Sequence, residues 1–150
     1  MARRRKTASR DEMLGALRHS GFRVTPQRRA IIDYLDGRAD HPSARQIYSG
    51  LAGRGVRLSL ATVYNTLSRL VGLGMLRELQ FDESYNRYDT NLETHLNLVC
   101  TTCGAITDCR GAPPVEADEI LEQLGFETFT FRLEYHGVCA TCRSGLRREQ

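Results

Sequence analysis

Two cysteine pairs constrain the fold of this chain most. Cys100 and Cys103 are separated by two residues, and so are Cys139 and Cys142. A two-residue gap lets both thiolates of one turn reach a single ion at about 2.3 Å, the distance that tetrahedral zinc prefers. Four sulfur ligands leave no open position, so we predict a structural zinc site that links metal binding to folding by about 10 kcal/mol. The alternative is that the paired thiols serve redox exchange or are simply buried.

The compartment decides between metal ligation and disulfides. No secretory signal is apparent, and no apolar run approaches the roughly 20 residues needed to span a bilayer. We therefore expect a cytoplasmic protein without a membrane partner, in which cysteines bind metal. The fifth cysteine, Cys109, stands alone at the end of a predicted strand, and we expect it to be a small buried side chain rather than a sensor.

Charge divides the chain into a basic and an acidic half. Residues 1–90 carry 16 Arg or Lys against 9 Asp or Glu, whereas residues 91–150 carry 5 against 9. A GC-rich genome explains why 20 of the 21 cations are Arg, but it does not explain this asymmetry. A basic half suits a polyanion, since the guanidinium fork matches phosphate and guanine edges. We predict one domain over 1–90, with 1–8 as a disordered basic tail, and a second over 91–150.

The basic half has the pattern of a winged helix. Four apolar stripes at helical spacing predict four helices, and residues 75–81 and 85–89 alternate about the turn 82–84, which indicates a hairpin. Each predicted helix follows a residue suited to an N-cap: Ser9, Thr25, Ser43 and Ser59.

The acidic half reads as a small α/β unit. Strands are predicted over 95–100, 105–109 and 128–135, with an acidic helix over 115–124. The fold class is thus α+β, in which a winged-helix domain precedes a small α/β domain that carries zinc.

Several motifs occur together in the order and at the spacing of one known family. They are residues 21–28, 41–44, 61–67 and 87–89, together with the two cysteine pairs. With these motifs the sequence resembles the ferric uptake regulator family. The resemblance covers residues 12–143 and implies a homodimeric repressor with an N-terminal DNA-binding domain and a C-terminal dimerisation domain. Three positions resemble the peroxide-sensing branch more than the iron-uptake branch, namely Asn65, Asp89 and the run 132–134.

The resemblance also implies a second, regulatory metal site. The ligands implied by position are His41, Asp89, His95 and Asp108; by themselves these are only scattered polar residues. Mixed nitrogen and oxygen ligands suit Fe²⁺ or Mn²⁺, and an ion bound from both halves would fix the angle between them. The alternative is a degenerate site and a protein that binds DNA without it.

One ligand position departs from the family pattern. Asn97 stands where the family has a second histidine, and an amide oxygen is a weaker donor than imidazole, which moves selectivity towards manganese. Glu93 is a possible substitute if it shares the strand face. In the peroxide branch, bound ferrous iron reacts with hydrogen peroxide and oxygen is added to a ligating histidine, which here implies His41 or His95.

The fourth helix is the expected recognition helix in the major groove. Asn65 has the geometry for a bidentate contact with adenine, and Tyr64 can pack on a thymine methyl. The resemblance implies that Arg23 enters an A/T-rich minor groove. A dimer implies a palindromic A/T-rich operator in double-stranded DNA. The full set of expected DNA contacts is Arg23, Thr62, Tyr64, Asn65 and Arg69.

Other function classes fit less well. A zinc hydrolase needs an open zinc position, which four cysteines do not leave. A thiol oxidoreductase needs a reactive cysteine pair beside a βαβ unit, and zinc content distinguishes it. The sequence contains no G-x-S-x-G motif, no H-E-x-x-H motif and no phosphate-binding glycine loop. We therefore expect neither an enzyme nor a small organic substrate. Within regulators, an iron-, manganese- or zinc-uptake sensor is the remaining alternative.

Overall fold

The computed structural model describes residues 7–80, 86–111, 115–128 and 132–146. The chain forms two compact units, Met1–Glu93 and Thr94–Gln150, which divide close to the boundary predicted at residue 90.

Four helices make up most of the first unit, and each begins where its cap was predicted. The side chain of each N-cap accepts a hydrogen bond from the backbone N–H three residues on, and Ser9 and Ser43 form complete capping boxes. The helices are α1 (Arg10–His19), α2 (Pro26–Leu35), α3 (Ala44–Ala52) and α4 (Leu60–Gly72).

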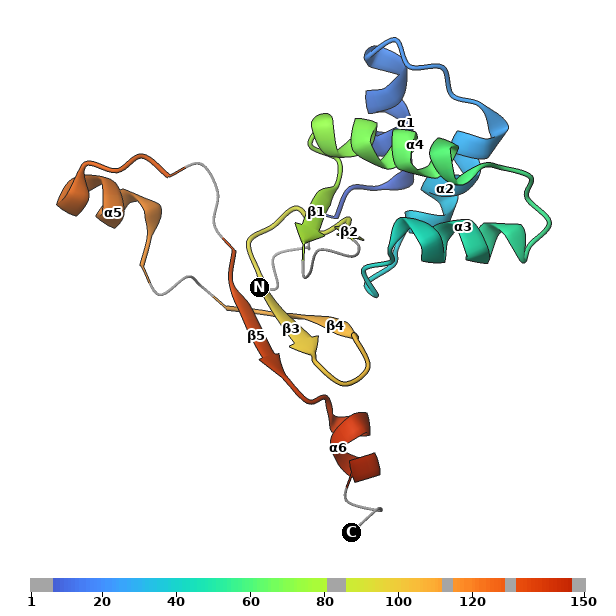
Figure 1. Cartoon of the computed structure of the whole chain (residues 1–150). Coiled ribbons are helices and arrows are strands. Elements are labelled where there is room, and N and C mark those ends of the chain that lie inside the picture. The colour runs from blue at the N-terminus through green and yellow to red at the C-terminus, as the bar shows by residue number, and fades with distance from the viewer. Residues whose placement is uncertain (1–6, 81–85, 112–114, 129–131, 147–150) are drawn as a thin grey trace. The chain divides into compact units, whose positions relative to one another are not determined.

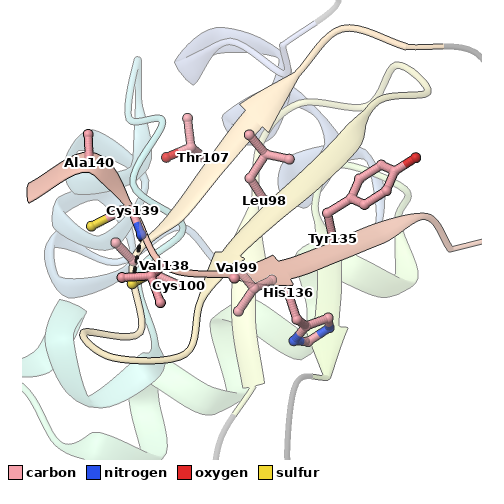
Figure 2. Close-up of a pocket in the computed structure, with 11 residues that line it drawn as sticks. Leu98, Val99, Cys100, Thr107, Tyr135, His136, Val138, Cys139 and Ala140 are labelled. Carbon is pink, nitrogen blue, oxygen red and sulfur yellow. Dashed lines mark hydrogen bonds between the residues drawn. The ribbon is translucent and has the colours of Figure 1, made fainter. Parts of the chain in front are cut away.

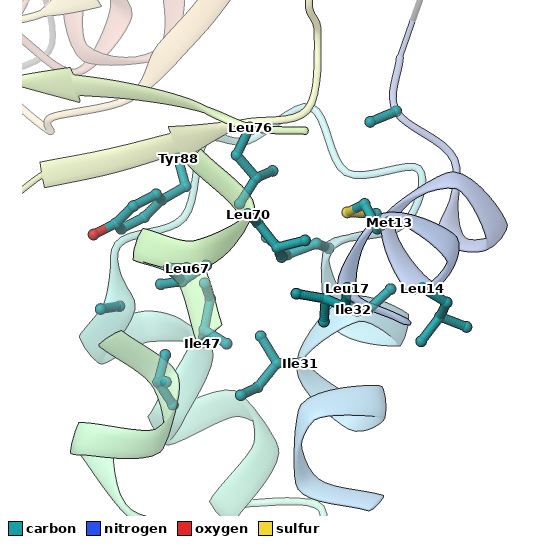
Figure 3. Close-up of a cluster of buried hydrophobic side chains, with 14 of the residues drawn as sticks. Met13, Leu14, Leu17, Ile31, Ile32, Ile47, Leu67, Leu70, Leu76 and Tyr88 are labelled. Carbon is teal, nitrogen blue, oxygen red and sulfur yellow. The ribbon is translucent and has the colours of Figure 1, made fainter. Parts of the chain in front are cut away.

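The core of the first unit lies where α4 packs against α1, α2 and α3 (Figure 1). Figure 3 shows apolar side chains from all four helices meeting there, among them Leu17, Ile31, Ile47 and Leu67, and each of these four is fully buried. Burial of one such side chain contributes about 1.5–3 kcal/mol, so this core holds the four helices of the first unit together.

A hairpin completes the winged helix. Strand β1 (Arg77–Gln80) pairs antiparallel with β2 (Asn86–Asp89), and Glu78 lies opposite Tyr88. The Tyr88 side chain enters the helical core, which ties the wing to the helices. The first strand starts at residue 77 rather than at residue 75, and residues 81–85, with the predicted turn 82–84, lie outside the described residues.

The predicted disordered tail was wrong for its last two residues. Thr7 forms a bridge with Asn91, and the Ala8 N–H donates to the Thr90 carbonyl oxygen at 2.9 Å. Ala8 is also buried, because a small apolar residue before the Ser9 cap fits the core. Residues 1–6 of that prediction lie outside the described residues.

The second unit contains a three-stranded sheet in the order β4-β3-β5. The central strand β3 (Leu96–Cys100) is antiparallel to β4 (Ile106–Cys109) and parallel to β5 (Glu134–Gly137). Two helices belong to this unit, α5 (Ala117–Leu124) and α6 (Ala140–Leu146). Every residue of α5 is described, and none of them is buried.

Two sequence predictions for this unit need correction, and one helix was missed. The last strand was predicted from residue 128 but begins at Glu134, since its extent is set by pairing with β3 rather than by its own pattern. The acidic helix begins at Ala117 rather than residue 115, and α6 was not predicted. Among the described residues, no helix has the length and hydrophobicity required to cross a membrane.

Candidate metal centres and nucleic-acid interface

The two cysteine pairs converge at one end of the sheet in the second unit. Cys100 ends β3 and Cys139 follows β5; because these strands are parallel neighbours, their carboxyl ends lie together. The four sulfur atoms all lie within 4.8 Å of one another, and those of Cys103 and Cys139 are 3.9 Å apart. Four ligands at 2.3 Å from a tetrahedral ion would be about 3.8 Å apart. The cluster therefore fits the ion that its spacing predicts.

Backbone hydrogen bonds make the sulfur atoms unequal. The Cys139 N–H donates to Cys100 Sγ at 3.3 Å (Figure 2), and this bond is the main reason that the pKa of Cys100 falls to about 6. The neighbouring sulfurs, first that of Cys139, raise the pKa of Cys142 to about 12. Four thiolates cannot coexist here without a cation, and a divalent metal offsets their repulsion.

His41 and Asp89 form a buried pair in the first unit. His41 lies between α2 and α3 in a left-handed backbone conformation, φ 48°. The buried Arg87 of β2 donates to the His41 carbonyl oxygen at 2.9 Å and to Gln46 Oε1 at 3.0 Å, which fixes this loop against the wing. His41 Nε2 lies 3.6 Å from Asp89 Oδ2, and both side chains are at most 3% exposed.

His95 and Asp108 form a similar pair in the second unit. His95 directly precedes β3 and Asp108 lies on β4, and His95 Nε2 is 3.5 Å from Asp108 Oδ1. Asn97 lies opposite Asp108 in the strand register. Its side chain is 6% exposed, and Oδ1 has no hydrogen-bond partner among the described residues. A cation or a hydrogen-bond donor that binds this buried oxygen would satisfy it.

The geometry of both pairs suits metal ligation better than direct hydrogen bonding. Distances of 3.5 and 3.6 Å are too long for a good hydrogen bond. Two ligand atoms about 2.1 Å from one ion at the tetrahedral angle would be about 3.4 Å apart. Glu93, the possible substitute ligand, precedes β3 and is not on the strand, because pairing with β4 starts only at Leu96. The prediction of its strand face was therefore wrong.

The expected DNA contacts lie in the first unit on α4 and on the loop before α2. Tyr64 and Asn65 are exposed on α4, and Tyr64 is 41% exposed. Thr62 is half-buried, and its hydroxyl lies 2.9 Å from that of the Ser59 cap. Arg23 is exposed on the loop.

Arg69 was among the expected DNA contacts, but sequence reasoning missed two residues beside it, Phe22 and Arg28. Arg69 donates to the Ser20 carbonyl oxygen at 3.1 Å and its guanidinium carbon lies 5.7 Å from the Phe22 ring centre. Arg28 lies over the same ring at 3.9 Å and donates to the Arg23 carbonyl oxygen. The motif of residues 21–28 contained Phe22 and Arg28, but nothing in their spacing indicated stacking.

Cys109 stands apart from the cysteine cluster. It lies at the end of β4, is half-buried, and its thiol donates only weakly to the Arg110 carbonyl oxygen at 3.6 Å.

Four helices and a wing, together with a four-cysteine cluster and two histidine–carboxylate pairs, define a class: winged-helix DNA-binding regulators that depend on metal. The sequence model of the ferric uptake regulator family matches residues 19–136. The chain belongs to the ferric uptake regulator family.

Individual relatives agree with this assignment. A peroxide-responsive repressor, PerR, from Staphylococcus epidermidis is 34% identical over 134 residues, 89% of this chain and 89% of that protein. A ferric uptake regulator structure from Francisella tularensis with iron is 29% identical, with a TM-score of 0.70 over 82% of this chain and 96% of that chain. A PerR structure from Streptococcus pyogenes is 32% identical, with a TM-score of 0.50 and coverage of 94% and 98%.

Proposed function

We propose that this family member is a transcriptional repressor that binds ferrous iron or manganese at its regulatory site and senses peroxide through the iron-bound form. The observation that carries the proposal is the presence of two buried histidine–carboxylate pairs, with nitrogen–oxygen distances of 3.6 and 3.5 Å. The peroxide stimulus is supported by 34% identity to the peroxide-responsive repressor of Staphylococcus epidermidis. Asp89 and Asn65 also stand where the peroxide-sensing branch differs from the iron-uptake branch.

The proposed regulatory ligands are His41, Asp89, His95 and Asp108, with Asn97 as a further oxygen donor. Each histidine–carboxylate pair supplies two ligands, which is too few for Fe²⁺ or Mn²⁺, so we propose that one ion takes both pairs. The buried amide oxygen of Asn97 supports its inclusion, since a cation would satisfy it. Nitrogen and oxygen donors favour these two ions over softer ones.

Such a site would act as a switch between the two units. His41 and Asp89 belong to the unit with the recognition helix, whereas His95 and Asp108 belong to the other. An ion held by both pairs would restrict how the DNA-binding units are presented to the operator, and loss of a ligand would release them. The iron supplies the peroxide chemistry, and the chain supplies His41 and His95 as the side chains that are oxidised.

The experiment measures binding to a fluorescein-labelled A/T-rich palindromic duplex by fluorescence anisotropy under anaerobic conditions. Addition of ferrous iron should tighten binding, and stoichiometric peroxide should then abolish it. Mass spectrometry should find one added oxygen atom on a peptide that contains His41 or His95. Manganese-loaded protein is the matched control, because it should bind the duplex and resist peroxide.

An uptake regulator of the same family is the second candidate, and Asn97 is the observation that favours it. Loss of an imidazole ligand weakens the iron site and moves its preference towards manganese. Binding that requires metal but survives peroxide, with unmodified histidine peptides, would establish this candidate in place of peroxide sensing.

We further propose that the second unit forms a homodimer and that the operator is palindromic. Apolar side chains are exposed on the sheet, where Leu98, Tyr135 and Val138 line a hollow of about 340 Å³ (Figure 2). The helix α5 exposes Leu121 and Leu124 as well. Exposed apolar surface of this kind is typical of a protein interface.

The cysteine cluster is proposed to hold structural zinc in a cytoplasmic protein. None of the five cysteines is in a disulfide, which leaves the four sulfurs of the cluster available as ligands. A closed set of four sulfurs gives no position for a substrate, which supports a structural role over catalysis.

A further inference from the structure

An open hollow of about 380 Å³ lies in the first unit beside the recognition helix. Residues 65, 68 and 69 line it from α4, where spacings of three and four place side chains on one helix face. The opposite face of α4 carries the buried residues Val63 and Leu67. The other wall comes from Phe22 and from Arg28 on α2.

The side chains that line this hollow are suited to an anion. Two guanidiniums share the Phe22 ring, with Arg28 at 3.9 Å and Arg69 at 5.7 Å from its centre. Neither arginine has a carboxylate ion-pair partner in the part of the chain that the structure describes. Asn65 and Ser68 add an amide and a hydroxyl donor, and the lining contains no acidic residue.

The N-terminus of α2 adds to this positive charge. Arg28 is the third residue of α2, whose first turn contains no acidic side chain. The partial positive charge of the helix dipole is therefore not neutralised there. Two cations in one hollow repel each other, and an anion between them relieves that repulsion.

We propose that this hollow binds one backbone phosphate of duplex DNA. The inference rests on the DNA-binding function proposed above, because it places the phosphate next to exposed Asn65 on the recognition helix. It also gives Arg69 a new role. Its guanidinium is tied to the Ser20 carbonyl oxygen, so it contacts the phosphate with Arg28 while Tyr64 and Asn65 face the bases. Such a contact sets the register of the helix on DNA but carries no sequence information.

The test is the salt dependence of DNA binding by Arg28→Gln. Fluorescence anisotropy is measured over a series of salt concentrations with two labelled duplexes, one of random sequence and one A/T-rich and palindromic. Loss of one phosphate contact should lower the slope of log K against log salt by about 0.9. Affinity should fall by the same factor for both duplexes, so the preference for the A/T-rich duplex should not change.

Arg38→Gln is the matched control. Arg38 also stacks on an aromatic ring, at 4.4 Å from the centre of Tyr34, but it is paired with Asp40 and does not line the hollow. The two variants change the net charge equally, and only Arg28→Gln should change the slope. Arg28→Lys keeps the charge and should retain the slope.

Four results would overturn the proposal. An unchanged slope for Arg28→Gln would exclude the phosphate contact. If Arg28→Lys lowers the slope as much as Arg28→Gln does, Arg28 stabilises the loop before α2 rather than binding phosphate. The same conclusion follows if Arg28→Gln loses the preference for the A/T-rich duplex while its slope is unchanged. A shift of the Arg28 Nε–H resonance with inorganic phosphate, without any effect of the variant on DNA, would assign a free anion instead. Binding to the random-sequence duplex does not depend on the proposed metal regulation. The slopes can therefore be measured even if the proposed metal regulation is wrong.

Discussion

Replacement of Asn97 by leucine and by aspartate separates the cost of a buried amide from its use as a metal ligand. Asn97 is 6% exposed, and its Oδ1 atom has no hydrogen-bond partner among the described residues. An unsatisfied buried acceptor costs about 1–3 kcal/mol. Without regulatory metal, Asn97→Leu should therefore raise the free energy of unfolding of the second unit by that amount. Asn97→Asp should lower it, because it places a second carboxylate opposite Asp108.

Metal affinity should follow the reverse order. Aspartate supplies a charged oxygen donor, asparagine a neutral one, and leucine none. We expect the aspartate variant to bind Mn²⁺ at least tenfold more tightly than the leucine variant, which corresponds to about 1.4 kcal/mol. The variant that is most stable without metal should thus be stabilised least by metal.

Two measurements on zinc-loaded protein test this pair of orders. Hydrogen exchange of the β3 amides reports the local stability, and the electron paramagnetic resonance signal of free Mn²⁺ reports affinity. Asn65→Leu is the control, because Asn65 is exposed and its replacement should change stability by no more than about 0.5 kcal/mol. No gain of stability in Asn97→Leu would mean that the amide is already satisfied. Equal Mn²⁺ affinity for asparagine and leucine would remove Asn97 from the ligand set.

Four further predictions concern the zinc cluster, the core, the wing and the dimer. Cys142→Ser should lose zinc by mass spectrometry and lose strand signal in the far-ultraviolet circular dichroism spectrum; retained zinc with an unchanged spectrum would contradict the structural role. Leu67→Ala should cost about 2–5 kcal/mol in urea unfolding, since the side chain is fully buried, and a cost below about 1 kcal/mol would contradict this packing. Burial raises the pKa of Tyr88 above its ordinary value, so its contribution to stability is complete below about pH 10 and is lost as the unfolded chain ionises above it. Tyr88→Phe should therefore lose less stability than the parent protein between about pH 9 and pH 11, and parallel losses would refute this assignment. Leu121→Glu should shift sedimentation towards the monomer, whereas an unchanged dimer would place the interface elsewhere.

Local chemistry explains which parts of the fold were predictable from sequence. An N-cap and its helix are neighbours in the chain, so Ser9 and Ser43 could be assigned with their helices before any tertiary contact was known. The cysteine pairs were predictable for the same reason, since each pair spans a single turn.

The features that could not be predicted from the sequence depend on pairing between segments that are distant in the chain. The start of β5 at Glu134 depends on its register with β3, which lies far away in sequence. The pairing of His41 with Asp89 and the stacking of Arg28 on Phe22 likewise join distant or differently oriented elements. Only the family resemblance brought His41 and Asp89 together in advance, and nothing indicated the role of Arg28.

Two departures from local rules of stability lie at proposed regulatory ligands. His41 has φ 48°, a conformation that is uncommon outside glycine, and it is held by the bond from Arg87 to its carbonyl oxygen. Asn97 buries an acceptor without a partner among the described residues. The four N-caps of the first unit and its apolar core show no such conflict. Costs confined to one set of residues are expected where structure is retained for function rather than for folding. A cation bound at Asn97 Oδ1 would offset the cost of its buried acceptor, which is why metal removal should loosen this position before it affects the helical core.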